Sequence, residues 1–324
     1  MQTLLKTTSA YKLLRAEKME NRLNHAYLLL MDDARSLRET LNVFARVFFG
    51  CDEPANSREQ ARIAELIKKE SYADCLFYPK PDKKFTVADA DEIKEESSLN
   101  PVEGDKKLFV IGDFAEVGVA QQNKLLKLLE EPPKNVYFLL GATTSYPILQ
   151  TVLSRTKKLE ILSFSEGDVL AFLRRNYPEK ATNTEEMKIF AATSNGSVGN
   201  AQNALEGGYF SELIEDSFSL CLNAKELPIL AKKLGESKRK KELLSFLRLI
   251  FRDAAFLKTN ADPFFFLLRS ERTRIEKVAT RYSLNALLYA QQLFTDAEKE
   301  LKFNTNFTQC IEICFAKLNA RNEK

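Results

Sequence analysis

Short apolar runs alternate with amphipathic stretches through the first half of the chain. The runs at residues 26–31, 108–111, 136–142 and 158–162 have the length and apolar character of buried strands. Strands that are separated by helical stretches are typical of a parallel sheet covered by helices. The pattern therefore predicts an α/β domain in the first half of the chain.

The stretch VAQQNKLLKLLEEPP at residues 119–133 predicts the clearest helix of this domain. Four leucines between positions 125 and 129 give it an apolar face. Pro132 and Pro133 are expected to end the helix, because proline lacks the backbone N–H and its ring clashes with the preceding turn. The polar segment before residue 107 predicts a loop, a short helix over 87–97 and a second loop.

Helical periodicity replaces the strand pattern beyond residue 163. A small helical unit is expected to end at the glycine pair at 207 and 208, which is typical of a linker. Apolar positions at helical spacing continue through residues 238–258, 284–303 and 307–318. We therefore predict three domains: an α/β domain at 1–163, a small helical domain at 164–207 and a larger helical domain at 208–324.

Composition and charge fit a folded protein rather than a dedicated nucleic-acid binder. Hydrophobic residues make up 44% and charged residues 29% of the 324 residues, which is the balance of a globular chain that can bury several cores. The 48 Lys and Arg exceed the 45 Asp and Glu by only three, so any contact with DNA must be local. The basic run Lys238-Arg239-Lys240-Lys241 is either a solvated helix start or a local phosphate contact.

Cysteine usage and the absence of long apolar runs favour a cytoplasmic protein. The five cysteines are scattered without CxxC pairing, which argues against a disulfide framework and favours reduced thiols. Cys310 and Cys314 lie one helical turn apart and are expected to be buried core thiols. No stretch of the sequence reaches the ~20 apolar residues of a membrane span, and the first residues lack a signal-peptide pattern.

The most specific motif is KKLFVIGDFAEVGVAQQNKLLKLLEEPPKNVYFLLGATTSYPILQTVLSRTKKLEI, at residues 106–161. It resembles the second half of the ATPase domain in bacterial clamp-loader subunits of DNA polymerase III. In that family a strand with acidic residues at its end precedes a helix of the form NALLKxLEEPP, then a strand with sensor threonines, then a Ser-Arg-Cys motif. Here Thr143 and Thr144 follow the strand, and Ser154-Arg155-Thr156 stands in place of the last motif.

Weaker likeness extends over the rest of the chain. LNHAYLLL at residues 23–30 resembles the family's first strand, and LKFNTNF at residues 301–307 resembles its C-terminal collar. The resemblance implies a P-loop-NTPase-like (AAA+) α/β domain with a parallel sheet, followed by a small helical lid domain and an all-α collar domain for oligomerisation.

The residues that would bind ATP depart from the family's pattern. A phosphate loop needs GxxxxGK[ST], because backbone N–H groups cradle the phosphates, lysine reaches them and the hydroxyl holds Mg²⁺. The chain has MDDARSLRETL there, without glycine or lysine, and Asp32 and Asp33 would repel a triphosphate. Gly112-Asp113 replaces the family's acidic pair, and Gly199 stands where hydrolysing relatives carry a sensor arginine. These losses predict a subunit without bound ATP and without enzymatic activity of its own.

Arg155 is the residue expected to act in catalysis. The resemblance implies that this arginine reaches into the ATP site of a neighbouring subunit as a trans arginine finger, with Ser154 as its motif partner. A guanidinium there stabilises the charge that develops on the transferring phosphoryl group. Thr156 replaces the family's cysteine, which leaves the electrostatic role of the guanidinium intact. The alternative is an ordinary surface arginine at the start of a strand.

The resemblance also raises the question of zinc, because many relatives in this family carry a four-cysteine module after the first helix. Cys51 stands where its first ligand would be, but the next cysteine is Cys75. A structural zinc ion needs four Cys or His ligands in paired spacing. We therefore predict that the module has lost its metal.

The resemblance also implies partners and a role. The chain would assemble with gamma or tau and delta subunits into a ring-shaped complex, act as its stator, and reach the sliding clamp and primed DNA through that complex, with no membrane contact. Two alternatives remain: a gamma-like motor ATPase with an atypical phosphate loop, and a stand-alone DNA-binding adaptor. ATP binding by the isolated protein would favour the first, and tight, salt-dependent binding to primed DNA would favour the second.

Overall fold

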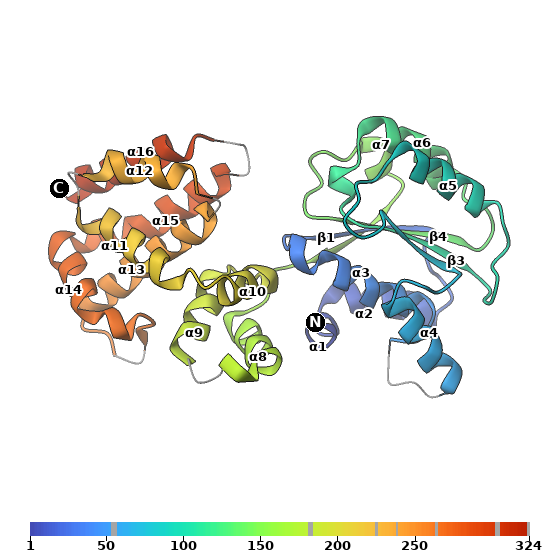
Figure 1. Cartoon of the computed structure of the whole chain (residues 1–324), viewed down its shortest axis with the longest axis horizontal. Helices are drawn as coiled ribbons and strands as arrows, with labels where there is room; N and C mark the ends of the chain where they lie inside the picture. The colour runs from blue at the N-terminus through green and yellow to red at the C-terminus, as the bar shows by residue number, and fades with distance from the viewer. Residues whose placement is uncertain are drawn as a thin grey trace. The chain divides into compact units, whose positions relative to one another are not determined.

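The computed structural model describes residues 1–52, 57–180, 184–223, 226–237, 239–262, 265–301 and 305–322. These residues form two compact units, Met1–Ser163 and Phe164–Lys324 (Figure 1). The predicted division into three domains, with a further boundary after residue 207, stays a prediction. Lys238 of the basic run and residues 302–304 of the collar motif lie outside the described residues.

The first unit is built on a parallel sheet. Among its described residues five strands pair in the order β2-β3-β4-β1-β5, and every neighbouring pair is parallel. The strands are β1 (Ala26–Met31), β2 (Cys75–Tyr78), β3 (Lys107–Ile111), β4 (Val136–Ala142) and β5 (Lys157–Ile161). The predicted α/β fold with a parallel sheet is confirmed, and the strands expected at 26–31 and 136–142 have those bounds.

Strand β2 is absent from the sequence-based prediction. It pairs with β3 from Cys75 opposite Leu108 to Tyr78 opposite Ile111. Its four residues, CLFY, are too few to show a period, and polar residues flank them. The other differences are shifts of one residue at the ends of β3 and β5, which is the usual uncertainty of strand ends.

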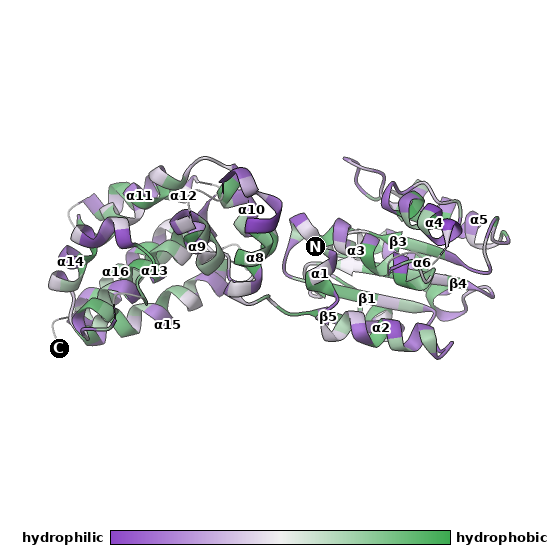
Figure 2. Cartoon of the chain, turned by 90° about the horizontal axis from the view of Figure 1, so that it is seen from below, coloured by the Kyte–Doolittle hydropathy of each residue, from purple (hydrophilic) through white to green (hydrophobic). Residues whose placement is uncertain are grey.

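Helices cover both faces of this sheet (Figure 1). One face carries α5 (Val87–Ser97), α6 (Val119–Glu130) and α7 (Gln150–Leu153), whose apolar side chains form a core with alternate strand residues such as Leu28, Phe109 and Phe138. The other side carries α1 (Gln2–Leu5), α2 (Ser9–Met19), α3 (Ala34–Phe48) and α4 (Arg58–Lys68). Figure 2 shows the hydrophobic strands β1, β3 and β4 between these helices.

Helix α3 lies close against β4 because Gly141 has no side chain. A Cβ at this position would lie 2.6 Å from Cδ1 and 2.9 Å from Cδ2 of Leu41. Leu41 itself is fully buried. The close contact fixes α3 on the sheet, and with it the α3 N-terminus that follows β1.

The second unit is helical in its described residues, as predicted. Its helices are α8 (Glu166–Asn176), α9 (Thr184–Thr193), α10 (Val198–Glu206), α11 (Phe210–Leu222), α12 (Leu227–Gly235), α13 (Lys240–Lys258), α14 (Arg272–Arg281), α15 (Leu284–Glu300) and α16 (Phe307–Asn322). Their core centres on α13, where the ring of Phe251 lies 5.5 Å from Phe294 of α15 and 6.4 Å from Phe315 of α16.

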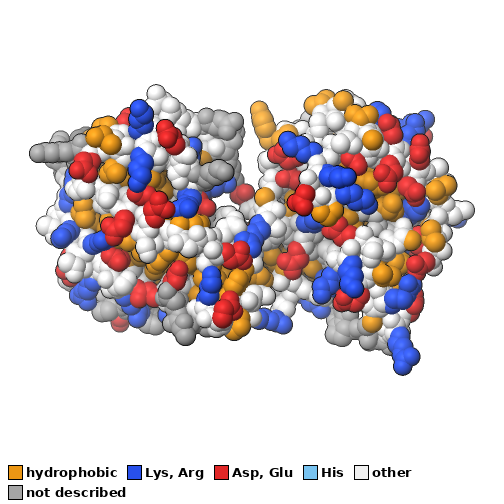
Figure 3. All heavy atoms as spheres, in the orientation of Figure 1, with side chains coloured by type: hydrophobic (Ala, Val, Ile, Leu, Met, Phe, Trp, Pro, Cys, Tyr) orange, Lys and Arg blue, Asp and Glu red, His pale blue; other side chains and the backbone are white. Residues whose placement is uncertain are grey.

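The face of each unit that Figure 3 shows carries charges of both signs. On the face that Figure 3 shows, Lys and Arg side chains are interspersed with Asp and Glu over both units. Such a surface fits the near-balance of charge in the sequence. None of the helices in the described part of the chain combines the length and the apolar character that a bilayer crossing requires.

Candidate functional site

The carboxyl ends of β1, β3 and β4 meet at one edge of the sheet, and this is the edge where open α/β sheets bind ligands. Asp32 and Asp33 follow β1, and Gly112 and Asp113 follow β3. Because β4 pairs with both β1 and β3, these residues follow the two strands that flank β4. The structure thus brings four of the predicted residues to one place.

Asp33 occupies the N-terminus of α3. Its carboxylate accepts a hydrogen bond from the backbone N–H of Ser36 at 3.0 Å, and only 6% of the residue is exposed. A helix N-terminus favours an anion, because its free N–H groups and the helix dipole both attract negative charge. In this chain the carboxylate of Asp33 already occupies the start of α3, and Asp32 lies exposed beside it. A triphosphate would have to displace one like charge and approach another.

Arg38 of α3 lies beside the end of β3 and is already paired within the chain. Its Nε donates to a carboxylate oxygen of Glu70 at 2.6 Å, and its Nη1 donates to the backbone oxygen of Pro79 at 3.0 Å. A Cβ built on Gly112 would lie 3.8 Å from this Nη1. An incoming phosphate would therefore compete with Glu70 for this guanidinium.

Asp113 is a carboxyl in an unfavourable environment. Its backbone is left-handed, at φ 36° and ψ 64°, and its Oδ1 is buried with no hydrogen-bond partner in the described part of the chain. Burial raises the pKa of this carboxyl and the charge of Glu116 raises it further, while backbone hydrogen bonds at Thr143 and Ala115 act in the opposite sense. The site therefore disfavours the ionised form that a metal-binding aspartate would need.

We expect Asp113→Asn to raise the free energy of unfolding at pH 7. Folding raises the pKa of Asp113, so the folded state favours the protonated carboxyl. The stability that this carboxyl contributes is fully present below its unfolded pKa and is lost as pH rises through its folded pKa, which leaves a buried charge at pH 7. Asparagine has no charge to bury and tolerates the left-handed conformation. Urea denaturation should show the gain at neutral pH and its disappearance below the ordinary carboxyl pKa of 3.8. A less stable variant at pH 7 would contradict this account.

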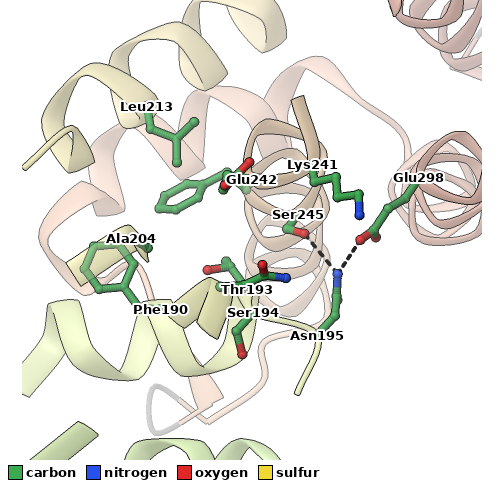
Figure 4. A pocket seen from close by; sticks show the side chains of 12 residues that line it. Phe190, Thr193, Ser194, Asn195, Ala204, Leu213, Lys241, Glu242, Ser245 and Glu298 are labelled. Atoms are coloured by element: carbon green, nitrogen blue, oxygen red, sulfur yellow. Dashed lines mark hydrogen bonds between the residues drawn. The ribbon is translucent and has the colours of Figure 1, made fainter. Parts of the chain in front are cut away.

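Gly199 belongs to the second unit and is the second residue of α10. It is buried, and as a glycine it has no side chain that could contact a nucleotide. Hydrogen bonds join the turn before α10 to α13 and α15. Asn195 donates from Nδ2 to Oε1 of Glu298 in α15 at 2.6 Å and to Oγ of Ser245 in α13 at 3.3 Å (Figure 4). The turn that precedes Gly199, the residue expected to replace a sensor arginine, is thus held by contacts with the following helices.

Arg155 lies just before β5 begins, at the amino ends of the parallel strands, whereas Asp33 lies at their carboxyl ends. Its Nη1 donates to the backbone oxygen of Thr151 at 2.8 Å and to Oγ of Ser154 at 3.3 Å. Its Nη2 forms an ion pair with Glu130, the last residue of α6. The side chain is 32% exposed. The structure therefore separates Arg155 from Asp33 and anchors its guanidinium at the surface of the first unit.

The two hydroxyl residues beside Arg155 bond to the backbone of the α7 turn. Ser154 donates from Oγ to the oxygen of Thr151 at 3.1 Å, and Thr156 donates from Oγ1 to the oxygen of Val152 at 3.1 Å. These bonds stiffen the turn that carries Arg155. Threonine at 156 thus has a structural use in this chain that does not involve the guanidinium.

Sequence reasoning missed two residues of α6, Gln122 and Glu130. Gln122 is fully buried: its Nε2 donates to the oxygen of Val117 at 2.8 Å, and its Oε1 accepts from the N–H of Leu149 at 2.9 Å. It therefore ties α6 to the loop that follows β4. A polar residue on the apolar face of a helix, three residues before Leu125, was the available signal. No local signal identifies Glu130 as the partner of Arg155.

The cysteines of the chain are buried, and the described residues contain no cluster of metal ligands. Cys51, Cys75, Cys221, Cys310 and Cys314 are free and buried. Burial raises the pKa of Cys51 to about 11 and that of Cys75 well above its ordinary value, which disfavours the thiolate that binds metals. Among the described residues no group of three or more His, Cys, Asp or Glu could hold a metal ion, and residues 53–56 lie outside them. The loss of zinc stays a prediction.

About half of the chain matches a known protein family. Residues 6–165 match the family model described as DNA polymerase III, delta subunit. DNA polymerase III subunit gamma of Buchnera aphidicola subsp. Schizaphis graminum is 25% identical over 257 residues, which cover 70% of this chain and 69% of that protein. DNA polymerase III subunit delta' of Bacillus subtilis is 28% identical over 148 residues, which cover 46% of this chain and 45% of that protein.

A solved structure of a DNA polymerase III gamma subunit-related protein from Thermotoga maritima covers 95% of this chain and 99% of its own, at 17% identity and a TM-score of 0.40. The sheet, its helices and the helical second unit define the class of an AAA+-like protein. Within this class the chain is related to the clamp-loader subunits of DNA polymerase III: residues 6–165 match the delta-subunit family, and gamma and delta' subunits are among its relatives.

Proposed function

We propose that this chain is the delta-prime subunit of the clamp loader, the member of the family that does not hydrolyse ATP. One observation carries the proposal: the carboxylate of Asp33 caps α3 where a nucleotide phosphate would bind. The paired Arg38 and the unfavourable carboxyl of Asp113 support it. The delta' protein of Bacillus subtilis is among the relatives of the chain. No intrinsic enzymatic activity and no bound ATP or zinc are expected.

In this proposal Arg155 is a trans arginine finger, with Ser154 as its motif partner. Gamma or tau and delta subunits would be the assembly partners, and the sliding clamp and primed DNA would be met through the complex in the cytoplasm. The chain would act as a stator, because nothing in its own cycle would depend on nucleotide. The exposure of Arg155 at an edge of the sheet away from Asp33 supports a role toward another subunit.

The alternative is a gamma- or tau-like motor ATPase with an atypical phosphate loop. It is favoured by the relatives named gamma and tau, and the gamma subunit of Buchnera aphidicola matches 70% of the chain. For ATP to bind, a helix already capped by Asp33 would have to accept phosphate in its place. This is the step that the electrostatics of the edge oppose.

Titration of the isolated protein with Mg-ATP separates the two functions. Isothermal calorimetry should give no binding heat, and the thermal unfolding temperature should not change with ATP concentration. A ligand present at 100 times its Kd stabilises a protein by about 2.7 kcal/mol, so a motor ATPase would show a clear shift. A gamma or tau subunit measured alongside is the positive control. Micromolar binding by this chain would refute the delta-prime assignment.

A further inference from the structure

The C-terminus of α6 carries charges that a helix by itself disfavours. The helix ends at Glu130, Glu131 follows, and Pro132 and Pro133 prevent its continuation. Carbonyl groups at a helix C-terminus carry partial negative charge, so cations are favoured there and carboxylates are not. Residues that depart from such a local preference are often found at functional or strained sites. Lys127 supplies one cation in the last turn of the helix, and Arg155, which pairs with Glu130, supplies a second.

The anchoring contacts of Arg155 leave part of its guanidinium available. Nη1 donates to Thr151 and Ser154, and Nη2 pairs with Glu130. A guanidinium has about five N–H groups, and these contacts use three of them. The others, on Nε and Nη2, belong to a side chain that is 32% exposed. Contacts within the chain can therefore hold the Arg155 side chain while its remaining N–H groups bind an anion of another molecule.

We propose that Glu130 is a positioning residue for Arg155, which holds the guanidinium in one orientation before a neighbouring phosphoryl group arrives. The inference rests on the proposed function of Arg155 as a trans finger. A long side chain that is already oriented loses less conformational freedom in the transition state, and small errors in placement lower the rate strongly. Since the two side chains are 32% and 44% exposed, their pairing contributes little to folding stability. In this proposal the ion pair instead fixes the orientation of the guanidinium.

Glu131 offers a matched control. It has the same charge as Glu130, follows it directly, and is exposed at the C-cap of α6. In the described part of the chain it forms no ion pair with Arg155. Removing either carboxylate changes the net charge and the helix end in the same way, so only a difference between the two variants reports on the contact.

The test uses single-turnover ATP hydrolysis by the complete clamp loader, assembled from this chain and its gamma or tau and delta subunits, with sliding clamp and primed DNA. Arg155→Ala defines the phase of hydrolysis that depends on the finger. We expect Glu130→Ala to slow this phase about tenfold with unchanged ATP affinity of the complex. Glu130→Gln keeps an acceptor oxygen and should recover most of the rate, and Glu131→Ala should match the wild type.

A double variant shows whether Glu130 acts through Arg155. Glu130→Ala should have no further effect once Arg155→Ala is present. If Arg155→Ala removes the phase while Glu130→Ala leaves it unchanged or faster, the positioning role is wrong and the finger role stands. If Arg155→Ala changes nothing, the proposed function itself is wrong. A Glu130→Ala chain that fails to fold or assemble, by circular dichroism and gel filtration, would show a structural role and also overturn the inference.

Discussion

The clamp loader that carries Arg155→Ala should assemble normally and hydrolyse the ATP next to this chain at least about 10³-fold more slowly, because arginine fingers contribute roughly 10³ to 10⁵ in rate. The loss follows from the missing guanidinium, which would stabilise charge on the transferring phosphoryl group. Assembly should survive because the pair with Glu130 is partly exposed, and such pairs contribute about 0–1 kcal/mol. Quenched-flow measurement of a single turnover would resolve the slow site from the others.

Arg22→Ala is the control for this variant. Arg22 lies in the same unit and pairs with Glu20, and both side chains are largely exposed, at 74% and 51%. Its removal changes the charge by the same amount away from Arg155 and should leave every phase of hydrolysis intact. Equal rates in the Arg155→Ala and wild-type complexes, at equal assembly, would eliminate the finger role.

Asp74→Ala should destabilise the first unit by about 3–5 kcal/mol, the largest loss that we expect from a single polar side chain there. Asp74 is fully buried directly before β2, and its carboxylate accepts from the backbone N–H groups of Val102, Glu103 and Gly104 at 2.6, 2.8 and 2.7 Å. Without this acceptor, the loop that leads into β3 loses the partner of three N–H groups at once.

Urea denaturation followed by circular dichroism would measure this loss. Asp105→Ala is the matched control, since Asp105 follows the same loop and its side chain is 84% exposed beside Lys106. We expect the control to change the free energy of unfolding by less than about 0.5 kcal/mol. An Asp74→Ala variant as stable as Asp105→Ala would show that water replaces the carboxylate without loss.

The sheet could be predicted from the sequence because its central strands are continuous apolar runs. The strands β1 and β4 are buried on both faces, so nearly every residue in them is apolar and their bounds are sharp. Helix α6 could be predicted because its leucines form an apolar face and two prolines after it mark its end. Strand β2 could not, since four residues at a position away from the sheet centre show no period of their own.

The site could be predicted only where a local motif carries it. The aspartates after β1 were expected to repel phosphate, and the structure adds that Asp33 itself caps α3. A reader of the sequence could have found this cap, because Asp before a helical run is a common N-cap. The contacts of Gln122 with Leu149 and of Glu130 with Arg155 join residues more than twenty positions apart, and a single sequence contains no signal for such pairings.

The capped start of α3 also bears on what nucleotide binding at this edge of the sheet would require of the sequence. Replacing Asp33 alone would leave the helix start without its acceptor, at a loss of about 1 kcal/mol, before any phosphate contact exists. Adding a lysine alone would set it beside a carboxylate that neutralises it. Neither substitution alone creates a phosphate site, so nucleotide binding at this helix would need several changes together. Under the proposed function, the helix cap would therefore help to preserve a subunit without ATP.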